Sequence, residues 1–145
     1  MLEADQFNYT PHAVEFEKAS YAYLIGILAL LAGLPIPIIN FMACVFYYLS
    51  TRKETEFIRW HALQEAILQF TMLIINSVHI YWLLSIFIDN GSFTIGYFCM
   101  LGFVIAVNFL NIVESAIIFS NLQKYQHIRI LFFSSLTDKL DKIIK

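Results

Sequence analysis

Charged side chains are scarce in this sequence. Only 14% of the 145 residues are Asp, Glu, Lys or Arg, whereas 59% are hydrophobic and 17% are aromatic. The mean hydropathy is +0.68. A surface of this composition is too apolar to face water, which indicates lipid as the surrounding medium. The few charges lie mainly at the two ends and in one loop, so long apolar stretches separate them.

Several classes of function lack the residues that they require. The net charge is −2 and the chain has no dense Lys/Arg patch, whereas nucleic-acid binding needs several cations on one face. Cys44 and Cys99 have no CxxC partner and no clustered His residues, which argues against a metal site and a disulfide framework. The sequence also contains no nucleophile elbow, phosphate-binding glycine loop or HExxH motif. We therefore expect no enzyme activity, no cofactor, no metal and no nucleic-acid partner.

The first apolar stretch, residues 19–50, carries no charge. At about 1.5 Å per residue, one straight helix of this length would exceed the roughly 30 Å core of a bilayer. Pro35 and Pro37 disfavour a continuous helix. Two alternatives follow: one kinked span, or a hairpin of two short helices over residues 20–34 and 37–50.

Two further apolar stretches, residues 61–88 and 93–120, are each long enough to span a bilayer, and the turn signal Asp89-Asn90-Gly91-Ser92 makes them antiparallel. The last 25 residues combine cations with an apolar stripe at helical spacing, which predicts an interfacial amphipathic helix. The stripe comprises Phe132, Phe133, Leu136, Leu140 and Ile143. We thus expect an all-α polytopic membrane protein with a polar N-terminal segment (1–18), a helical membrane domain (19–120) and a cytoplasmic amphipathic tail (121–145).

The distribution of cations predicts the orientation. Arg52, Lys53 and Arg59 lie in one loop, and five further Lys and Arg residues lie in the tail, whereas the loop at Asp89 has none. The positive-inside rule therefore places the Arg52 loop and the C-terminus in the cytoplasm. A hairpin at Pro35 would put the N-terminus there too, and a kinked span would put it outside.

One segment carries a regular stripe of polar side chains. With Met72 between them, these residues follow one another at steps of three and four, which keeps them on one helix face. They are His61, Glu65, Gln69, Asn76 and His79. Two readings stay open: Arg59, His61 and Glu65 form a hydrogen-bonded cluster at the membrane surface that holds the Arg52 loop, or the stripe conducts ions or protons.

Two more faces are suited to helix packing. Asn108, Asn111 and Ser115 share a face in the last span, with Glu114 at its edge, and pairing with the His61–His79 stripe would satisfy both sets of polar groups. In the first apolar arm, small residues at steps of four, three and four form a groove that a helix of this chain or of another subunit can approach closely. These residues are Ala22, Gly26, Ala29 and Gly33.

Several short motifs resemble a known family. They are Tyr21-Ala22-Tyr23-Leu24, Gly33-Leu34-Pro35-Ile36-Pro37, Ile39-Asn40, Phe57-Ile58-Arg59-Trp60-His61-Ala62-Leu63-Gln64-Glu65-Ala66, Asn111-Ile112-Val113-Glu114 and Phe132-Phe133-Ser134-Ser135-Leu136-Thr137-Asp138. This pattern resembles the bacterial Tic-twenty-like family of small integral membrane proteins, relatives of the chloroplast inner-envelope import component. Glu65 departs from the family pattern, which has Ala directly after Gln. The resemblance implies four transmembrane helices, both termini on one side, the hairpin at Pro35, a bacterial inner membrane and a link to protein translocation.

Two functional hypotheses emerge from these patterns. The first is a non-enzymatic integral membrane subunit of a larger complex, associated with protein translocation, whose partners are the lipid bilayer and other membrane protein subunits. The second is an oligomeric channel or small transporter lined by the His61–His79 stripe. The residues on which both depend form one polar set: Arg59, His61, Gln64, Glu65, Gln69, Asn76, His79, Asn108, Asn111 and Glu114.

Overall fold

The computed structural model describes residues 7, 9–33, 36–89, 91–129 and 131–144. The described residues form five helices, and the predicted all-α fold is confirmed. In chain order the helices are α1 (Ala13–Gly33), α2 (Pro37–Thr51), α3 (Glu56–Ile88), α4 (Ile95–Leu122) and α5 (Leu131–Ile144).

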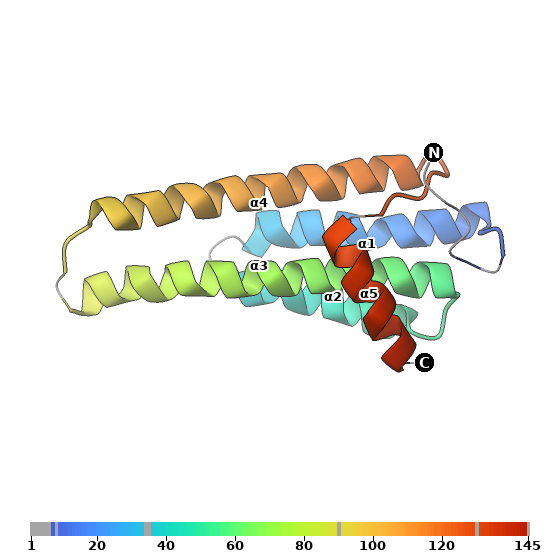
Figure 1. Ribbon diagram of the computed structural model, residues 1–145, viewed down its shortest axis with the longest axis horizontal. Coiled ribbons are helices and arrows are strands. Elements are labelled where there is room, and N and C mark those ends of the chain that lie inside the picture. Colours follow the sequence, from blue (N-terminus) through green and yellow to red (C-terminus); the bar gives the residue numbers. More distant parts are fainter. Residues whose placement is uncertain (1–6, 8, 34–35, 90, 130, 145) are drawn as a thin grey trace.

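The first apolar stretch forms two helices and not one kinked span. α1 and α2 run in opposite directions and pack against each other and against α3, as Figure 1 shows. Pro37 opens α2, where its fixed φ and missing N–H suit the first turn of a helix. Pro35 lies outside the described residues. The hairpin brings the start of α1 and the end of α2 to the same end of the molecule as α5.

α1 begins at Ala13, earlier than the predicted start at residue 20 and inside the segment expected to be polar. The Glu15 carboxylate accepts a hydrogen bond of 2.6 Å from the backbone N–H of His12 and one of 2.7 Å from the Tyr9 hydroxyl. These bonds hold the chain at the helix N-terminus, where a negative charge also interacts favourably with the helix dipole. The polar residues at the start of α1 are therefore helical.

Two described helices, α3 and α4, are long and apolar enough to cross a bilayer. The four transmembrane helices of the sequence prediction are not confirmed. α2 has 15 residues, or about 22 Å of helix, which is short of the roughly 30 Å core. α3 has 33 residues, or about 50 Å, so it is longer than the core. In Figure 1, α3 and α4 continue well beyond the end of α1 and the start of α2.

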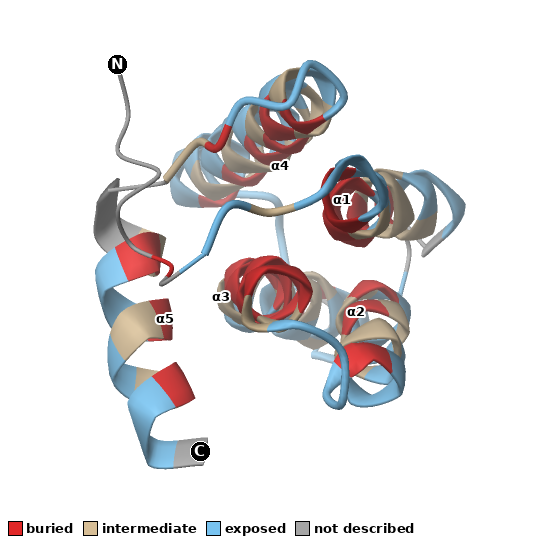
Figure 2. Ribbon diagram, turned by 90° about the vertical axis from the view of Figure 1, so that its right-hand side faces the viewer, coloured by how far each residue is buried: buried red, intermediate tan, exposed pale blue. Residues whose placement is uncertain are grey.

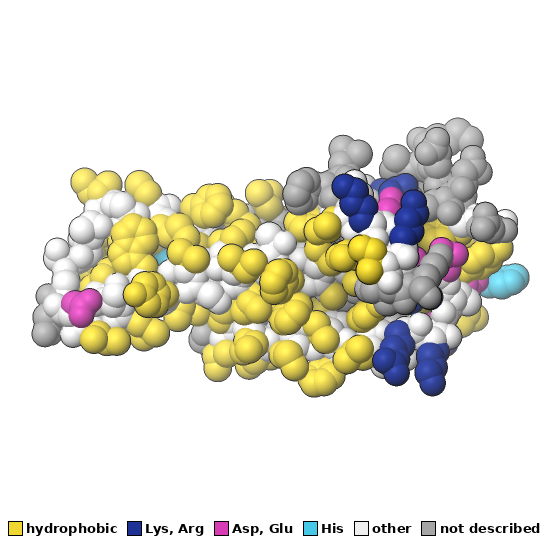
Figure 3. Space-filling view, turned by 60° about the horizontal axis from the view of Figure 1, so that its bottom comes forward, with side chains coloured by type: hydrophobic (Ala, Val, Ile, Leu, Met, Phe, Trp, Pro, Cys, Tyr) yellow, Lys and Arg dark blue, Asp and Glu magenta, His cyan; other side chains and the backbone are white. Residues whose placement is uncertain are grey.

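The surface is divided into an apolar part and a charged end. Figure 3 shows hydrophobic side chains over most of this face, with Lys and Arg gathered at the end where α5 lies. Large hydrophobic residues along α3 and α4 are exposed, among them Phe87, Ile95 and Phe109. An outward-facing apolar surface of this extent fits lipid contact.

The packed core lies at the charged end. Figure 2 shows the buried faces of α1 and α3 turned toward each other, and one buried edge of α5 turned toward α3. The core consists mainly of aromatic and small side chains from α1, α3 and α4 and from Phe7, which precedes α1: Phe7, Phe16, Ala19, Ala22, Tyr23, Phe57, Trp60, Ala62, Ile118 and Leu122.

Candidate functional site

The polar stripe of α3 faces the interior of the helix bundle. His61, Gln64, Glu65 and Gln69 are at most 1% exposed. Asn76 and His79, farther along the same face, are partly buried. The predicted shared face is thus present, and its residues meet α1 near the charged end and α4 farther along. Sequence periodicity identified the face, but not the helices that cover it.

A buried hydrogen-bond chain begins at Gln64 and runs through three rings. The Gln64 amide N–H donates to the Tyr23 hydroxyl oxygen at 3.0 Å, the Tyr23 oxygen lies 2.9 Å from His61 Nδ1, and His61 Nε2 lies 3.1 Å from His127 Nδ1. If the Tyr23 O–H donates to His61 Nδ1, then His61 carries its proton on Nε2. The His61 Nε2–H group then donates a hydrogen bond to His127 Nδ1. The proton of His127 then resides on Nε2, which is buried without a partner.

His127 lies in the connection between α4 and α5 and is 8% exposed. Burial, reinforced by the nearby charge of Arg129, lowers the pKa of His127 to about 4, against a smaller opposing effect of Asp138. Sequence reasoning missed both Tyr23 and His127 as partners of His61. They lie 38 and 66 residues away from it, and no sequence period connects them.

The Arg59-Trp60 part of the motif binds α5. Arg59 donates from Nε to Asp141 Oδ1 at 2.9 Å and from Nη2 to Asp141 Oδ2 at 3.3 Å. Trp60 Nε1 donates to Asp138 Oδ1 at 2.8 Å. Arg129 forms an ion pair with the same Asp138 and lies over the Trp60 ring. A bidentate guanidinium–carboxylate contact is strong and directional, so these residues fix the position of α5.

These contacts differ from the predicted cluster around the Arg52 loop. Arg59 binds α5, and His61 binds α1 and the α4–α5 connection. The loop after α2 is tied to α1 by another pair, Lys18 Nζ and Glu54 Oε1 at 2.9 Å. The reason is geometric: the Arg59 and Trp60 side chains point toward α5, whose Asp141 and Asp138 lie 82 and 78 residues later in the sequence.

α5 buries its polar face. Ser134, Thr137 and Asp141 are buried against the bundle, and the Ser134 hydroxyl donates to Gln64 Oε1 at 2.9 Å. The predicted apolar stripe points elsewhere: Leu136 and Ile143 are exposed, Phe133 and Leu140 are partly buried, and the Phe132 side chain is outside the description. α5 is therefore amphipathic as predicted, and some of its apolar side chains are exposed on the surface of the bundle.

Gly26 permits a close approach between α1 and the Glu65 carboxylate. A Cβ added at Gly26 would lie 2.0 Å from Glu65 Oε1 and 3.3 Å from Gln69 Nε2. Gln69 Nε2 donates to the same Oε1 at 2.9 Å. In the predicted small-residue groove, Ala22 and Gly26 are buried, Ala29 is partly buried and Gly33 ends α1. At Gly26 the partner of the groove is internal, namely α3.

The predicted pairing of the two polar faces occurs at Asn76 and Asn108. Asn76 Nδ2 donates to Asn108 Oδ1 at 3.1 Å, and Asn108 Nδ2 donates to Asn76 Oδ1 at 2.7 Å. Asn111 and Ser115 are buried, whereas Glu114 is partly exposed. The Asn111 amide, the Ser115 hydroxyl, Glu65 Oε2 and Gln69 Oε1 are buried without a hydrogen-bond partner, so the pairing satisfies only part of the interior polar groups.

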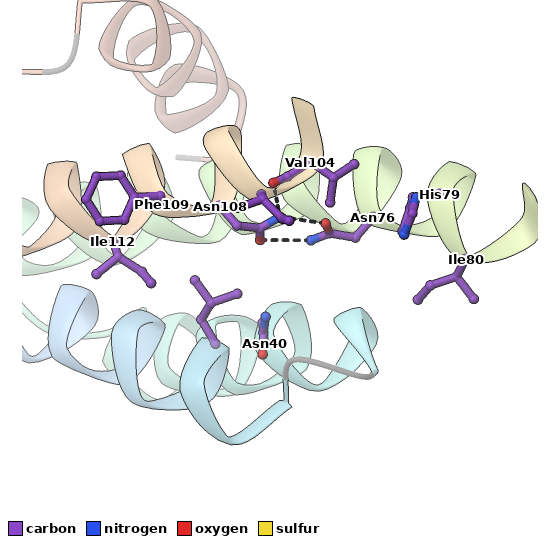
Figure 4. Close-up of a pocket in the computed structure, with 10 residues that line it drawn as sticks. Asn40, Asn76, His79, Ile80, Val104, Asn108, Phe109 and Ile112 are labelled. Carbon is purple, nitrogen blue, oxygen red and sulfur yellow. Dashed lines mark hydrogen bonds between the residues drawn. The ribbon is translucent and has the colours of Figure 1, made fainter. Parts of the chain in front are cut away.

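A cavity of about 290 Å³ lies between the turn end of the α1–α2 hairpin and the α3–α4 pair. Figure 4 shows Asn40 of α2 opposite the Asn76–Asn108 pair, with His79 farther along α3. The remaining walls are apolar and include Leu30, Ile80 and Phe109. Sequence reasoning did not place Asn40 in the site, since a lone Asn in an apolar run has no period that assigns it a face.

The described residues contain no group of three or more His, Cys, Asp or Glu side chains that could hold a metal ion. Their apolar surface, the two long apolar helices and the inward-turned polar groups define a small helical membrane protein. A family model described as the magnetosome magnetite crystal formation protein family (MamF/MmsF) matches residues 17–133. The chain belongs to this family.

This finding corrects the resemblance drawn from the sequence. The Tic-twenty-like assignment is wrong, because the matching family model covers most of the chain and describes a different family. The motif that suggested the assignment is short, and in the structure its residues pack α3 against α1 and α5. The link to protein translocation depended on that resemblance and loses its support. No curated protein and no solved structure matched this chain.

Proposed function

We propose that this chain is a non-enzymatic integral membrane protein that takes part in magnetite crystal formation as a subunit of a larger membrane complex. The observation that carries the proposal is the family match over residues 17–133. The exposed apolar surface of α3 and α4 supports the membrane location. The use of His61, Gln64 and Arg59 in contacts between helices supports a structural role for the polar motif.

The proposed orientation has α3 and α4 crossing the membrane, with the α1–α2 hairpin embedded beside them as the first two of four membrane helices. The Arg52 loop and both termini face the cytoplasm of a bacterial inner membrane. α5 lies at the cytoplasmic interface, where its exposed Leu136 and Ile143 contact lipid and Lys142 faces the headgroups.

Labelling of single cysteines tests this orientation. Cys44 and Cys99 are first replaced by Ser. One Cys is then introduced either at Lys53, in the Arg52 loop, or at Ser92, between α3 and α4. A membrane-impermeant maleimide added to intact spheroplasts should label Ser92→Cys and leave Lys53→Cys unlabelled until the cells are lysed. The reverse pattern would contradict the orientation.

Gene deletion and replacement test the function. In a magnetite-forming bacterium that carries this gene, we expect deletion to change crystal size or number in electron micrographs, and the wild-type chain to restore both. The Gly102→Ala chain should restore both as well, because a Cβ added at Gly102 meets no atom within 4 Å. Normal crystals in the deletion strain would refute the role in crystal formation.

Crosslinking tests the subunit role separately. Crosslinker added to intact membranes before detergent extraction should join the tagged chain to other membrane proteins in species that mass spectrometry identifies. A chain that is recovered only as an uncrosslinked monomer, under conditions that capture known membrane complexes, would contradict the subunit proposal.

A second candidate function, an oligomeric channel or small transporter, is favoured by the unpartnered polar atoms in the interior. They belong to Glu65, Gln69, Asn111 and Ser115. Such groups are costly in a membrane protein and often mark ion or proton pathways. In liposomes containing the purified chain, this hypothesis predicts a conductance or proton flux that Glu65→Gln and His79→Ala reduce. A flux that both variants leave unchanged would exclude the stripe as its path.

A further inference from the structure

The cavity at the turn of the α1–α2 hairpin combines apolar walls with amides and an imidazole. Asn40, Asn76 and Asn108 bring three amides to it, and His79 brings the imidazole. Leu30, Ile80, Val104, Ile105, Phe109 and Ile112 supply the apolar walls. Among the described residues, no Asp, Glu, Lys or Arg lines this cavity.

The cavity contains hydrogen-bonding capacity that the chain itself does not use. Asn40 is 2% exposed, and its Oδ1 has no partner. The Nδ1 atom of His79 is also buried without a partner. The His79 ring stacks on the Tyr97 ring, with the ring centroids 5.4 Å apart. Figure 4 shows Asn40 opposite the paired Asn76 and Asn108, with its amide nitrogen on the side of the pair. Buried polar groups without partners cost free energy, so a bound molecule that satisfies them gains affinity.

The walls identify the chemistry of that molecule. Ile105 and Phe109 line the cavity and are also more than 60% exposed, so the cavity opens onto the surface that faces lipid. A ligand that enters from the bilayer has an apolar body, and its polar head meets amides and an imidazole without a carboxylate, a guanidinium or an ammonium group. A charged head would remain uncompensated there, whereas a hydroxyl group can both donate and accept.

We propose that this cavity binds the hydroxyl-bearing head of a neutral acylglycerol-type lipid, with the acyl chain lying along α4. Asn40 and His79 bind the head, and Ile105 and Phe109 contact the start of the chain. The proposal rests on the membrane location of α3 and α4 but is independent of the role in crystal formation.

Photocrosslinking of the full-length protein in phosphatidylcholine nanodiscs tests this site. The probe is a monoacylglycerol with a diazirine near its glycerol end, and mass spectrometry maps the labelled peptides. We expect saturable labelling concentrated around residues 105–112 of α4 and near Ile80. Excess monoolein should compete, whereas methyl oleate, which has no hydroxyl, and phosphatidic acid, which is anionic, should not.

Variants test the two polar groups. Asn40→Leu and His79→Phe should each reduce the saturable labelling about five- to tenfold, the effect of losing one hydrogen bond. Asn121→Leu, near the other end of α4, is the control and should leave it unchanged. The competition pattern of the wild-type protein does not depend on whether a variant folds.

Three results would overturn the proposal. Labelling spread evenly over the lipid-facing surface, including Phe87 and Phe98, would indicate a cavity that holds only water. Equal competition by methyl oleate would remove the role of the hydroxyl group. Equal competition by phosphatidic acid would refute the neutral head. Because none of these measurements involves magnetite, their failure is distinguishable from failure of the proposed function.

Discussion

Replacement of Gly26 by Ala tests the contact between α1 and α3 most directly. The added Cβ would lie 2.0 Å from Glu65 Oε1 and 2.9 Å from Glu65 Cδ, so the carboxylate must move. Glu65 is fully buried, and its Oε1 accepts a hydrogen bond from Gln69. The displaced carboxylate therefore has no solvent to enter and loses a partner.

The expected change in the free energy of unfolding is the sum of two costs and one gain. Overpacking of a buried contact costs about 1–3 kcal/mol, and loss of the Gln69 hydrogen bond costs about 1 kcal/mol. The higher helix propensity of Ala returns about 1 kcal/mol. We expect Gly26→Ala to lower the free energy of unfolding by about 2 kcal/mol. At Gly102 only the propensity gain applies, because a Cβ there meets no atom within 4 Å.

Denaturant unfolding in detergent micelles, followed by circular dichroism, measures both variants. A double-mutant cycle supplies the decisive comparison: in a Glu65→Ala background the obstructing atoms are absent, so Gly26→Ala should cost little or nothing. Equal effects of Gly26→Ala and Gly102→Ala, or an undiminished cost in the Glu65→Ala background, would refute the internal packing of the small-residue groove.

Three further predictions concern other contacts of the structure. Because the pKa of His127 is lowered to about 4 in the folded state, protonation of its imidazole favours unfolding. The free energy of unfolding should be constant above pH 7 and about 2 kcal/mol lower at pH 5. His127→Gln should flatten this pH dependence in detergent unfolding. Asp141→Asn removes the charged partner of Arg59, and limited proteolysis should cut α5 about ten times faster, as expected for a loss of roughly 1.4 kcal/mol of docking energy. Asn76→Leu or Asn108→Leu alone removes both hydrogen bonds between the two amides, although in Asn76→Leu the Asn108 amide keeps its bond to the Val104 carbonyl, and should cost about 1–2 kcal/mol; the double variant should cost less than the sum in the same unfolding assay.

The outcomes that contradict these predictions are equally specific. A stability profile of the His127→Gln variant as steep as that of the wild type would locate the pH dependence elsewhere. An unchanged proteolysis rate for Asp141→Asn, with Ser135→Ala as the exposed control on the same helix, would mean that α5 is held by other contacts. Additive costs of the two Asn variants would show that the amides do not interact.

The amino-acid sequence by itself determined the class of fold and the faces of the helices. Apolar runs bounded by turn signals predicted the helices, because lipid contact and helix geometry both act over neighbouring residues. Steps of four placed His61, Glu65 and Gln69 on one face, and Pro37 marked the start of α2. The boundaries were less accurate, as the start of α1 at Ala13 shows, since local hydrogen bonds of Glu15 extend that helix into polar sequence.

Only the tertiary structure decided which faces meet. The docking of α5 on Arg59 joins residues 82 positions apart, and the contact of His61 with His127 joins residues 66 apart. Such contacts depend on three-dimensional packing, which leaves no period in one sequence. The same holds for Gly26, whose role follows from the position of Glu65 across the helix interface. The scarcity of charge thus predicted a membrane protein, while packing determined which of its polar groups bind one another.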